Sequence, residues 1–165
     1  MSADGLTVTA YDLARRLLGE KEIPGARANP YLSWALRLAG MGETPSDEIA
    51  NCSAFVFSIC HLLDLPRPTP VMNPARARSW LLIGQGIPLE QARPGFDLVV
   101  LKRGGGNQPG PEVLDAQGHV GFFAGASDAE VIGHGVRVLG ANQGDAVSYA
   151  DFAEDRVLGV RRLWP

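Results

Sequence analysis

The hydrophobic residues of the chain change their spacing near its middle. Up to about residue 84 they recur at the helical interval, whereas from about residue 97 they gather in short runs rich in Val, Leu and Phe, which are typical of strands. Helices followed by an antiparallel meander with short turns make an α+β domain. At 165 residues the chain is the size of one such domain, and we expect residues 1–165 to form it.

Capping and turn residues set the expected boundaries. Thr9 with Asp12 resembles a capping box, and Asn29 before Pro30 is a cap followed by a residue suited to the first helical position. The expected helices cover residues 9–19, 29–40, 51–63 and 73–84. The expected strands cover residues 97–101, 119–123, 136–139 and 157–161. The segment 103–118, rich in Gly and Pro, predicts a long loop that either borders a site or is an idle surface loop.

The charge balance excludes some partners. A net charge of −3 gives no electrostatic basis for binding nucleic acid or an anionic membrane. No apolar stretch is long enough to span a bilayer, and the N-terminus lacks the basic start and apolar core of a signal peptide. We therefore expect a soluble protein, made in the cytoplasm without membrane insertion, that reaches any other compartment by another route.

The cysteines are the residues most open to a chemical role. Cys52 and Cys60 are too few for a disulfide scaffold, and with three histidines they leave few ways to build a zinc site. Neighbours such as Cys60 and His61 diverge on a helix, so we expect no metal and no cofactor. The two thiols lie about 12 Å apart by helical rise, too far for a disulfide.

Position separates the two cysteines. Cys52 stands at the expected start of a helix, where unpaired N–H groups and the helix dipole lower the pKa of a thiol and favour the thiolate. The alternative is a small buried filler, which is common for free cysteines, and Cys60 is assigned that role.

A cysteine nucleophile needs a base, and the chain offers three histidines. His61 points away from the start of its own helix, and His134 is expected in a hairpin turn. His119 begins an apolar strand, from which an imidazole can project toward a helix terminus, so it is the expected base. Asn142 follows the next strand and could orient the imidazole, although Asn-Gln-Gly-Asp is also good turn chemistry.

Several segments, taken in order, resemble CHAP-like cell-wall hydrolases, which are papain-like cysteine amidases and peptidases common in phages and prophages. The segments are residues 51–56 (NCSAFV), 77–81 (ARSWL), 94–101 (PGFDLVVL), 118–123 (GHVGFF) and 139–145 (LGANQGD). Similar stretches at residues 21–25 and 156–162 extend the likeness over most of the chain. The resemblance implies a papain-like fold, with N-terminal helices packed on a small antiparallel sheet and the catalytic cysteine at a helix N-terminus.

The resemblance also implies roles for single residues. Cys52 would be the nucleophile, His119 the general base and then acid, and Asn142 the third polar residue. Ser53 and Gln143 would border the site, with backbone N–H groups at the helix start stabilising the oxyanion.

Two positions depart from the pattern of these hydrolases. Asn51 stands where they usually have Trp, as it does in some secreted amidase effectors, and Gly140 stands where many have Glu. Without that carboxylate the imidazolium is less stabilised, unless Asp97 or Asp145 supplies the charge.

The implied function is hydrolysis of an amide bond in bacterial peptidoglycan by a monomeric phage or prophage lysin. Its partners would be the cell wall and a holin or phage particle, or an immunity protein if the chain is a secreted amidase effector. The alternatives are a non-catalytic cell-wall-binding or structural component of a phage particle or secretion system, and acyl transfer to an amine through the same thioester.

Overall fold

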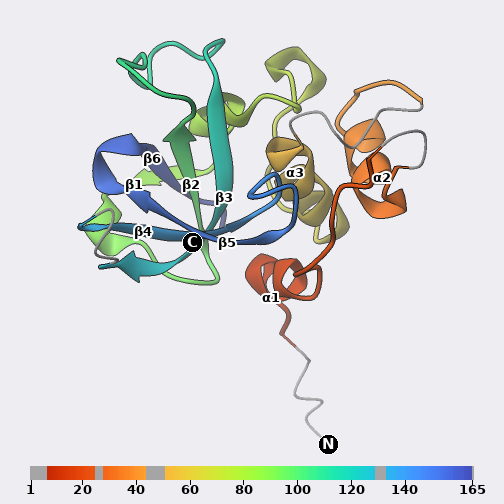
Figure 1. The fold of residues 1–165 in the computed structure, drawn as a ribbon, viewed down its shortest axis with the longest axis horizontal. Coiled ribbons are helices and arrows are strands. Elements are labelled where there is room, and N and C mark those ends of the chain that lie inside the picture. The colour runs from red at the N-terminus through yellow and green to blue at the C-terminus, as the bar shows by residue number, and fades with distance from the viewer. Residues whose placement is uncertain (1–6, 25–27, 44–50, 129–132, 165) are drawn as a thin grey trace, which may run out of the picture.

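The structure is a computed structural model that describes residues 7–24, 28–43, 51–128 and 133–164. Helices α1 (Ala10–Arg15), α2 (Pro30–Leu38) and α3 (Cys52–Leu62) come first, and a six-stranded antiparallel sheet follows. Figure 1 shows the helices gathered beside the sheet, with α3 next to β3. The α+β architecture expected from the change in hydrophobic spacing is confirmed. Residue 25, the end of one segment compared above, lies outside the described residues.

The first three helices begin where the sequence predicts. Before α1, the Thr9 Oγ1 accepts from the Asp12 N–H at 3.1 Å, and the Asp12 carboxylate accepts from the Thr9 N–H at 3.0 Å. Before α2, the Asn29 Oδ1 accepts from the Tyr31 N–H at 2.9 Å. These side chains satisfy backbone donors that the first turn of a helix leaves without partners.

The fourth helix expected at residues 73–84 does not form. Two 3₁₀ turns, η1 (Pro70–Met72) and η2 (Ala77–Leu82), take its place. Asn73 has a φ of 58°, in the left-handed region, where it cannot act as an extended N-cap. The Ser79 Oγ donates to the Asn73 carbonyl at 3.0 Å, and the Ser53 Oγ donates to the Pro74 carbonyl at 2.7 Å. Side chains thus bind the carbonyls that a helix would use.

The sheet has the strand order β1-β6-β2-β3-β4-β5. Its strands are β1 (Gln85–Ile87), β2 (Asp97–Lys102), β3 (Gly118–Ser127), β4 (Gly135–Gly140), β5 (Ser148–Ala153) and β6 (Val157–Arg162). The expected meander is found in β2, β3 and β4, and β5 extends it. The strand expected as its last member, β6, lies instead between β1 and β2 on the other side of the sheet. The sequence does not predict β1 and β5, which are the edge strands. Short or polar edge strands such as these lack the apolar run that reveals a central strand.

The core lies between α3 and the sheet. Residues 52–60 of α3 are all buried, and Phe55 meets Phe122 of β3 edge to face with ring centroids 6.2 Å apart. A second cluster, which includes Val99 and Val138, covers the other face. Each such side chain removed from water contributes roughly 1.5–3 kcal/mol, which fixes the start of α3 against the strands.

The long loop between β2 and β3 is organised by a buried arginine. Arg78 is fully buried and donates to loop carbonyls of Pro109 at 3.2 Å, Gly110 at 2.6 Å, Val113 at 3.0 Å and Gln117 at 2.9 Å. A side chain at Gly118 would place its Cβ 2.9 Å from the Arg78 Cγ, so this position requires glycine. The loop is therefore tied to η2 just before it enters β3.

Candidate active site

Cys52 and His119 come together at the end of the sheet nearest the start of α3. Cys52 is the first residue of α3 and His119 the second of β3, and their side chains are 3% and 4% exposed. Burial acts to raise the pKa of the Cys52 thiol, but the charge and hydrogen bond of His119 oppose it, with smaller contributions from the Val120 backbone and Arg103. The net result is a pKa below the ordinary value for a thiol, which favours the nucleophilic thiolate.

Cys60 has the opposite environment. It is fully buried among apolar side chains, and burial raises its pKa to about 12, with only a small opposing effect from the charge of Arg67. Both cysteines are free thiols. The lowered pKa of Cys52 has the direction expected from its position, but the main lowering contribution comes from His119 and not from the helix start.

The imidazole of His119 is held by Gln143 on its second nitrogen. His119 Nε2 lies 2.9 Å from the Gln143 Oε1. The Gln143 Nε2 donates to the carbonyls of Ser148 at 2.5 Å and Val138 at 3.3 Å, which can only accept and so fix which end of the amide faces the histidine. An amide oxygen accepts, so the neutral imidazole carries its proton on Nε2 and leaves Nδ1 as the basic nitrogen for the thiol. The Phe152 ring packs on the imidazole with centroids 5.4 Å apart.

Gly140, which stands where many CHAP-like hydrolases have Glu, lies against both the His119 imidazole and the Gln143 amide. A Cβ built on Gly140 would lie 3.2 Å from the Gln143 Oε1 and 3.4 Å from the His119 Nε2. A side chain at residue 140 would therefore meet the imidazole and the Gln143 amide, which already occupy the space beside it.

Asn142 makes different contacts from those that the sequence predicts. Its Oδ1 accepts a hydrogen bond from Arg103, and its Nδ2 donates to the Glu22 Oε1 at 3.3 Å. It is not hydrogen-bonded to His119, because its backbone, with a φ of 58°, turns it aside and presents the next residue to the ring. Asn142 therefore supports the loop between β4 and β5, and its neighbour Gln143 holds the histidine.

Glu22 is a site residue that sequence reasoning missed. Its Oε1 accepts from the Asn51 Nδ2 at 2.9 Å and from the Asn142 Nδ2 at 3.3 Å. It thereby ties the residue before Cys52 to the loop that carries Gln143. Its occurrence in the segment at residues 21–25, which resembles the hydrolases compared above, is the signal that could have found it.

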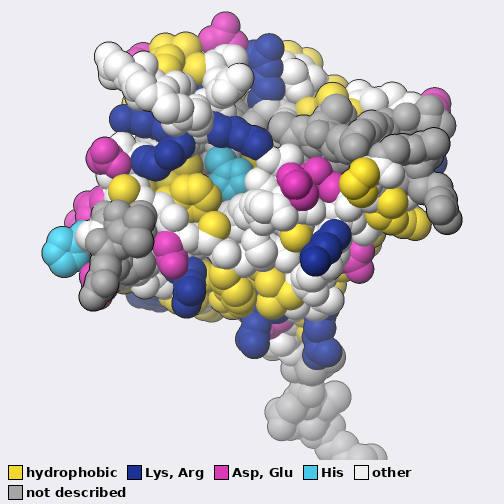
Figure 2. Space-filling model, in the orientation of Figure 1, with side chains coloured by type: hydrophobic (Ala, Val, Ile, Leu, Met, Phe, Trp, Pro, Cys, Tyr) yellow, Lys and Arg dark blue, Asp and Glu magenta, His cyan; other side chains and the backbone are white. Residues whose placement is uncertain are grey.

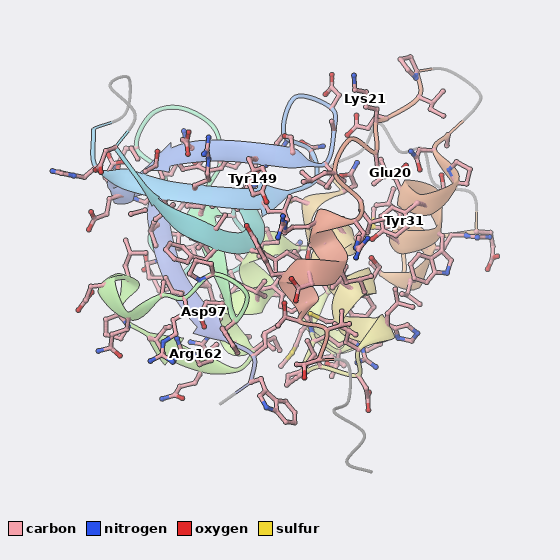
Figure 3. The ribbon with its side chains drawn as sticks, turned by 90° about the horizontal axis from the view of Figure 1, so that it is seen from below. Glu20, Lys21, Tyr31, Asp97, Tyr149 and Arg162 are labelled. Atoms are coloured by element: carbon pink, nitrogen blue, oxygen red, sulfur yellow. The ribbon has the colours of Figure 1, made fainter. Side chains whose placement is uncertain are left out.

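The remaining candidate residues have structural contacts. The Ser53 Oγ donates to the Pro74 carbonyl and accepts from the Trp80 Nε1 at 2.8 Å, so its side chain faces the core and only its backbone is at the helix start. Asp97 forms an ion pair with Arg162 through two hydrogen bonds, of 2.9 and 2.8 Å. In Figure 3 this pair lies well away from Tyr149, which lines a hollow together with His119. Asp145 is exposed, and neither aspartate is hydrogen-bonded to His119.

The other two histidines lie outside the site. His61 is exposed on α3, and the exposed His134 pairs with Asp128 at 3.1 Å in the turn before β4. His119 is therefore the histidine that the fold places beside Cys52.

Two hollows meet at this pair. One is lined by Cys52 together with Arg76 and residues 115–118, so the long loop does border the site. The other is lined by His119, Gln143 and Tyr149. Arg103 lies on the rim of both. Cys52 and His119 therefore each line a hollow, and the two hollows share Arg103.

No group of three or more His, Cys, Asp and Glu side chains in the described part of the chain is placed to hold a metal ion. Among the same residues, no helix has the length and apolar character needed to cross a membrane.

Solved structures with the same fold include two NlpC proteins of Trichomonas vaginalis. NlpC1 is 21% identical with a TM-score of 0.56 over 99% of this chain, and NlpC2 is 20% identical with a TM-score of 0.54 over 98%. The chain spans 47% and 49% of their lengths. No protein-family model and no curated protein matches the sequence. The likeness shows that this chain shares its α+β fold with these two NlpC proteins, which agrees with the helices and antiparallel sheet of the expected fold class.

Proposed function

We propose that the protein is a cysteine hydrolase that cleaves an amide bond of bacterial peptidoglycan. One observation carries the proposal: the Cys52 thiol, at the start of α3, interacts with an imidazole whose other nitrogen is held by Gln143. Nucleophile, base and orienting group are the minimal set for acyl transfer through a thioester. The cell wall as the source of substrate is supported by the motifs that resemble CHAP-like hydrolases and by the fold shared with NlpC proteins.

The site residues divide the reaction between them. The Cys52 thiolate attacks the amide carbon, and backbone N–H groups in the first turn of α3 stabilise the negative charge that develops on oxygen. The proton held on His119 Nδ1 passes to the amide nitrogen, and the C–N bond breaks to release the amine. His119 then takes a proton from water, whose oxygen attacks the thioester, and the acid product leaves as the thiolate re-forms. Gln143 keeps the imidazole in the tautomer that both steps need.

The test is release of free amines from purified peptidoglycan. Cys52→Ala and His119→Ala should abolish release, and Cys60→Ala, a matched change on the same helix, should retain it. Full activity of Cys52→Ala would overturn the assignment of the nucleophile, and loss of activity only in Cys60→Ala would transfer the role to that thiol.

The non-catalytic alternative would keep the fold and bind cell wall without cutting. The lowered pKa of Cys52 and the tautomer imposed by Gln143 favour catalysis, because a purely structural module needs neither. Mass spectrometry of treated peptidoglycan separates the two, since binding without any product would favour the structural role. Incorporation of an added amine into the product would instead indicate acyl transfer.

The proposal also concerns the class of hydrolase, phage lysin or secreted effector, and the way in which the protein reaches the cell wall. A phage or prophage lysin of the CHAP-like kind would be released through a holin or carried on a phage particle, whereas an amidase effector would be paired with an immunity protein. Asn51 before the nucleophile favours the effector, as in the Asn-Cys-Ser motif of secreted amidases. Co-purification with the products of neighbouring genes tests which partner is correct.

A further inference from the structure

The hollow on the His119 side of the site is basic. It has a volume of about 310 Å³, and Lys102, Arg103 and Arg156 are among its lining residues. No Asp or Glu is found among the described residues that line it. Figure 2 shows Lys and Arg side chains gathered beside a histidine on this face of the molecule. Such a concentration of positive charge in a concave site attracts an anionic group.

The two arginines in this lining have buried N–H groups that no described residue satisfies. Arg103 Nη1 and Arg156 Nε are both shielded from solvent and without a hydrogen-bond partner. Neither arginine forms an ion pair with a described residue. Buried donors are nearly always paired in folded proteins, so two unpaired donors on arginines that line one hollow need acceptors from outside the chain, which water or an anionic ligand can supply.

Both guanidinium groups are held in place by other contacts. Arg103 donates to the Asn142 Oδ1, and Arg156 Nη2 donates to the carbonyls of Lys102 at 2.9 Å and Gly104 at 3.2 Å. Contacts that fix a planar fork of donors reduce the ordering that binding would otherwise require. A carboxylate is the planar acceptor that best matches such a fork.

The chemistry of the site assigns this hollow to one half of the substrate. The acyl carbon bonds to Cys52, which lines the first hollow, and the leaving nitrogen takes its proton from His119, which lines the basic one. The basic hollow therefore lies on the side of the departing amine.

Resting on the proposed function, we propose that this hollow binds a carboxylate carried by the amine half of the substrate, with Arg156 and Arg103 as its ligands. The substrate class is then an amide whose leaving group is an amino acid or peptide with a free carboxylate close to the scissile nitrogen. Lys102 adds charge at the rim.

The direct test uses a pair of synthetic amides with the same acyl half. In one, the leaving residue ends in a free carboxylate, and in the other it ends in a carboxamide. The native protein should favour the carboxylate by about tenfold or more in kcat/KM, and Arg156→Met should reduce that preference to about twofold or less, chiefly through KM. Arg93→Met is the control, since Arg93 is exposed at the opposite end of β2 from Lys102 and should keep the full preference. Equal rates for the two amides with the native protein would overturn the proposal.

A second measurement needs no turnover. Iodoacetate and iodoacetamide alkylate the same Cys52 thiolate, so any change in its pKa cancels in the ratio of their rates. The ratio of the iodoacetate rate to the iodoacetamide rate should be about tenfold higher for the native protein than for Arg103→Met. The Lys102 side chain forms no hydrogen bond with a described residue, so Lys102→Met covers the case in which Arg103→Met fails to fold. It should lower the ratio of the iodoacetate rate to the iodoacetamide rate by a smaller factor.

The two measurements separate the failures. If the variants lower the ratio of the iodoacetate rate to the iodoacetamide rate but the protein hydrolyses no amide, the proposed function is refuted and the anion site is supported. If the protein hydrolyses both amides equally well, and the ratio of alkylation rates is unchanged in Arg103→Met and Lys102→Met, the anion site is refuted and the proposed hydrolase function is supported.

Discussion

The amide oxygen of Gln143 lies 2.9 Å from Nε2 of His119, which leaves Nδ1 of the ring as the nitrogen available to Cys52. The amide cannot turn round, because its nitrogen is bound to the carbonyls of Val138 and Ser148. A neutral acceptor in this position fixes the tautomer of the base without adding charge. The site is thus a Cys-His-Gln arrangement, in which the third residue orients the imidazole.

Removing the Gln143 amide should lower activity more than removing the Asn142 amide. In Gln143→Ala the imidazole loses its acceptor and can adopt the wrong tautomer, so kcat should fall roughly 10- to 100-fold. Asn142→Gly is the matched control, because glycine tolerates the φ of 58° at that position, and it should retain most of the activity. Steady-state kinetics of both variants give the answer. A larger loss in Asn142→Gly would restore Asn142 as the orienting residue.

The two cysteines should differ in reactivity toward iodoacetamide at a pH of about 6. The pKa of Cys52 is lowered, so its thiolate persists as the pH falls below the ordinary thiol range. The pKa of Cys60 is raised to about 12, so it stays protonated throughout. Peptide mapping after brief labelling should find carboxamidomethyl on Cys52 alone.

The same labelling tests the cause of the lowered pKa. His119→Ala removes the charge and the hydrogen bond that lower it and leaves the burial that raises it. The rate of Cys52 labelling at pH of about 6 should then fall at least tenfold, with full reactivity regained only in alkali. Unchanged labelling in His119→Ala would show that the helix start alone maintains the thiolate.

The sequence predicts the first two residues of the candidate site, which the structure brings together, because the position of each depends on local structure. Cys52 follows from its place at the start of an amphipathic segment, and His119 from its place at the start of an apolar strand. The choice between Asn142 and Gln143 depends on the turn around them, where Asn142 and Gly144 have φ values of 58° and 66°. Composition shows that a turn is present, but not which of its side chains faces the sheet.

The sequence also does not predict the roles of Glu22 and Arg78, because their partners lie far away in the chain. Glu22 reaches Asn51 and Asn142 only when the segment before α2 pairs with the turn before β5, through the Glu22 N–H and the Asp145 carbonyl at 2.9 Å. Arg78 was missed because a charged side chain is expected at the surface, whereas here it is fully buried.

A methyl group at Gly140 should affect activity without unfolding the protein. In Gly140→Ala the added Cβ would lie 3.2 Å from the Gln143 Oε1, which is tighter than an ordinary contact, and 3.4 Å from the His119 Nε2, which is an ordinary van der Waals distance. The amide must move a few tenths of an ångström, so kcat should fall by about tenfold while the melting temperature changes by only a few degrees. Kinetics and thermal unfolding on the same sample separate the two effects. A large drop in melting temperature would indicate that Gly140 is required for folding instead.

The buried Arg78 should be essential for the order of the long loop. Arg78→Met keeps most of the side-chain volume but leaves the carbonyls of residues 109, 110, 113 and 117 without their donor. Buried acceptors without partners cost about 1–3 kcal/mol each, although a loop that opens to water recovers most of this. We therefore expect a loss of roughly 2–3 kcal/mol in the free energy of unfolding and faster proteolysis within residues 103–117. Denaturant titration and limited proteolysis measure these two effects, with the exposed Arg37→Met on α2 as the control. Because the loop lines the hollow beside Cys52, kcat/KM should also fall, and an intact loop with full activity in Arg78→Met would contradict this role.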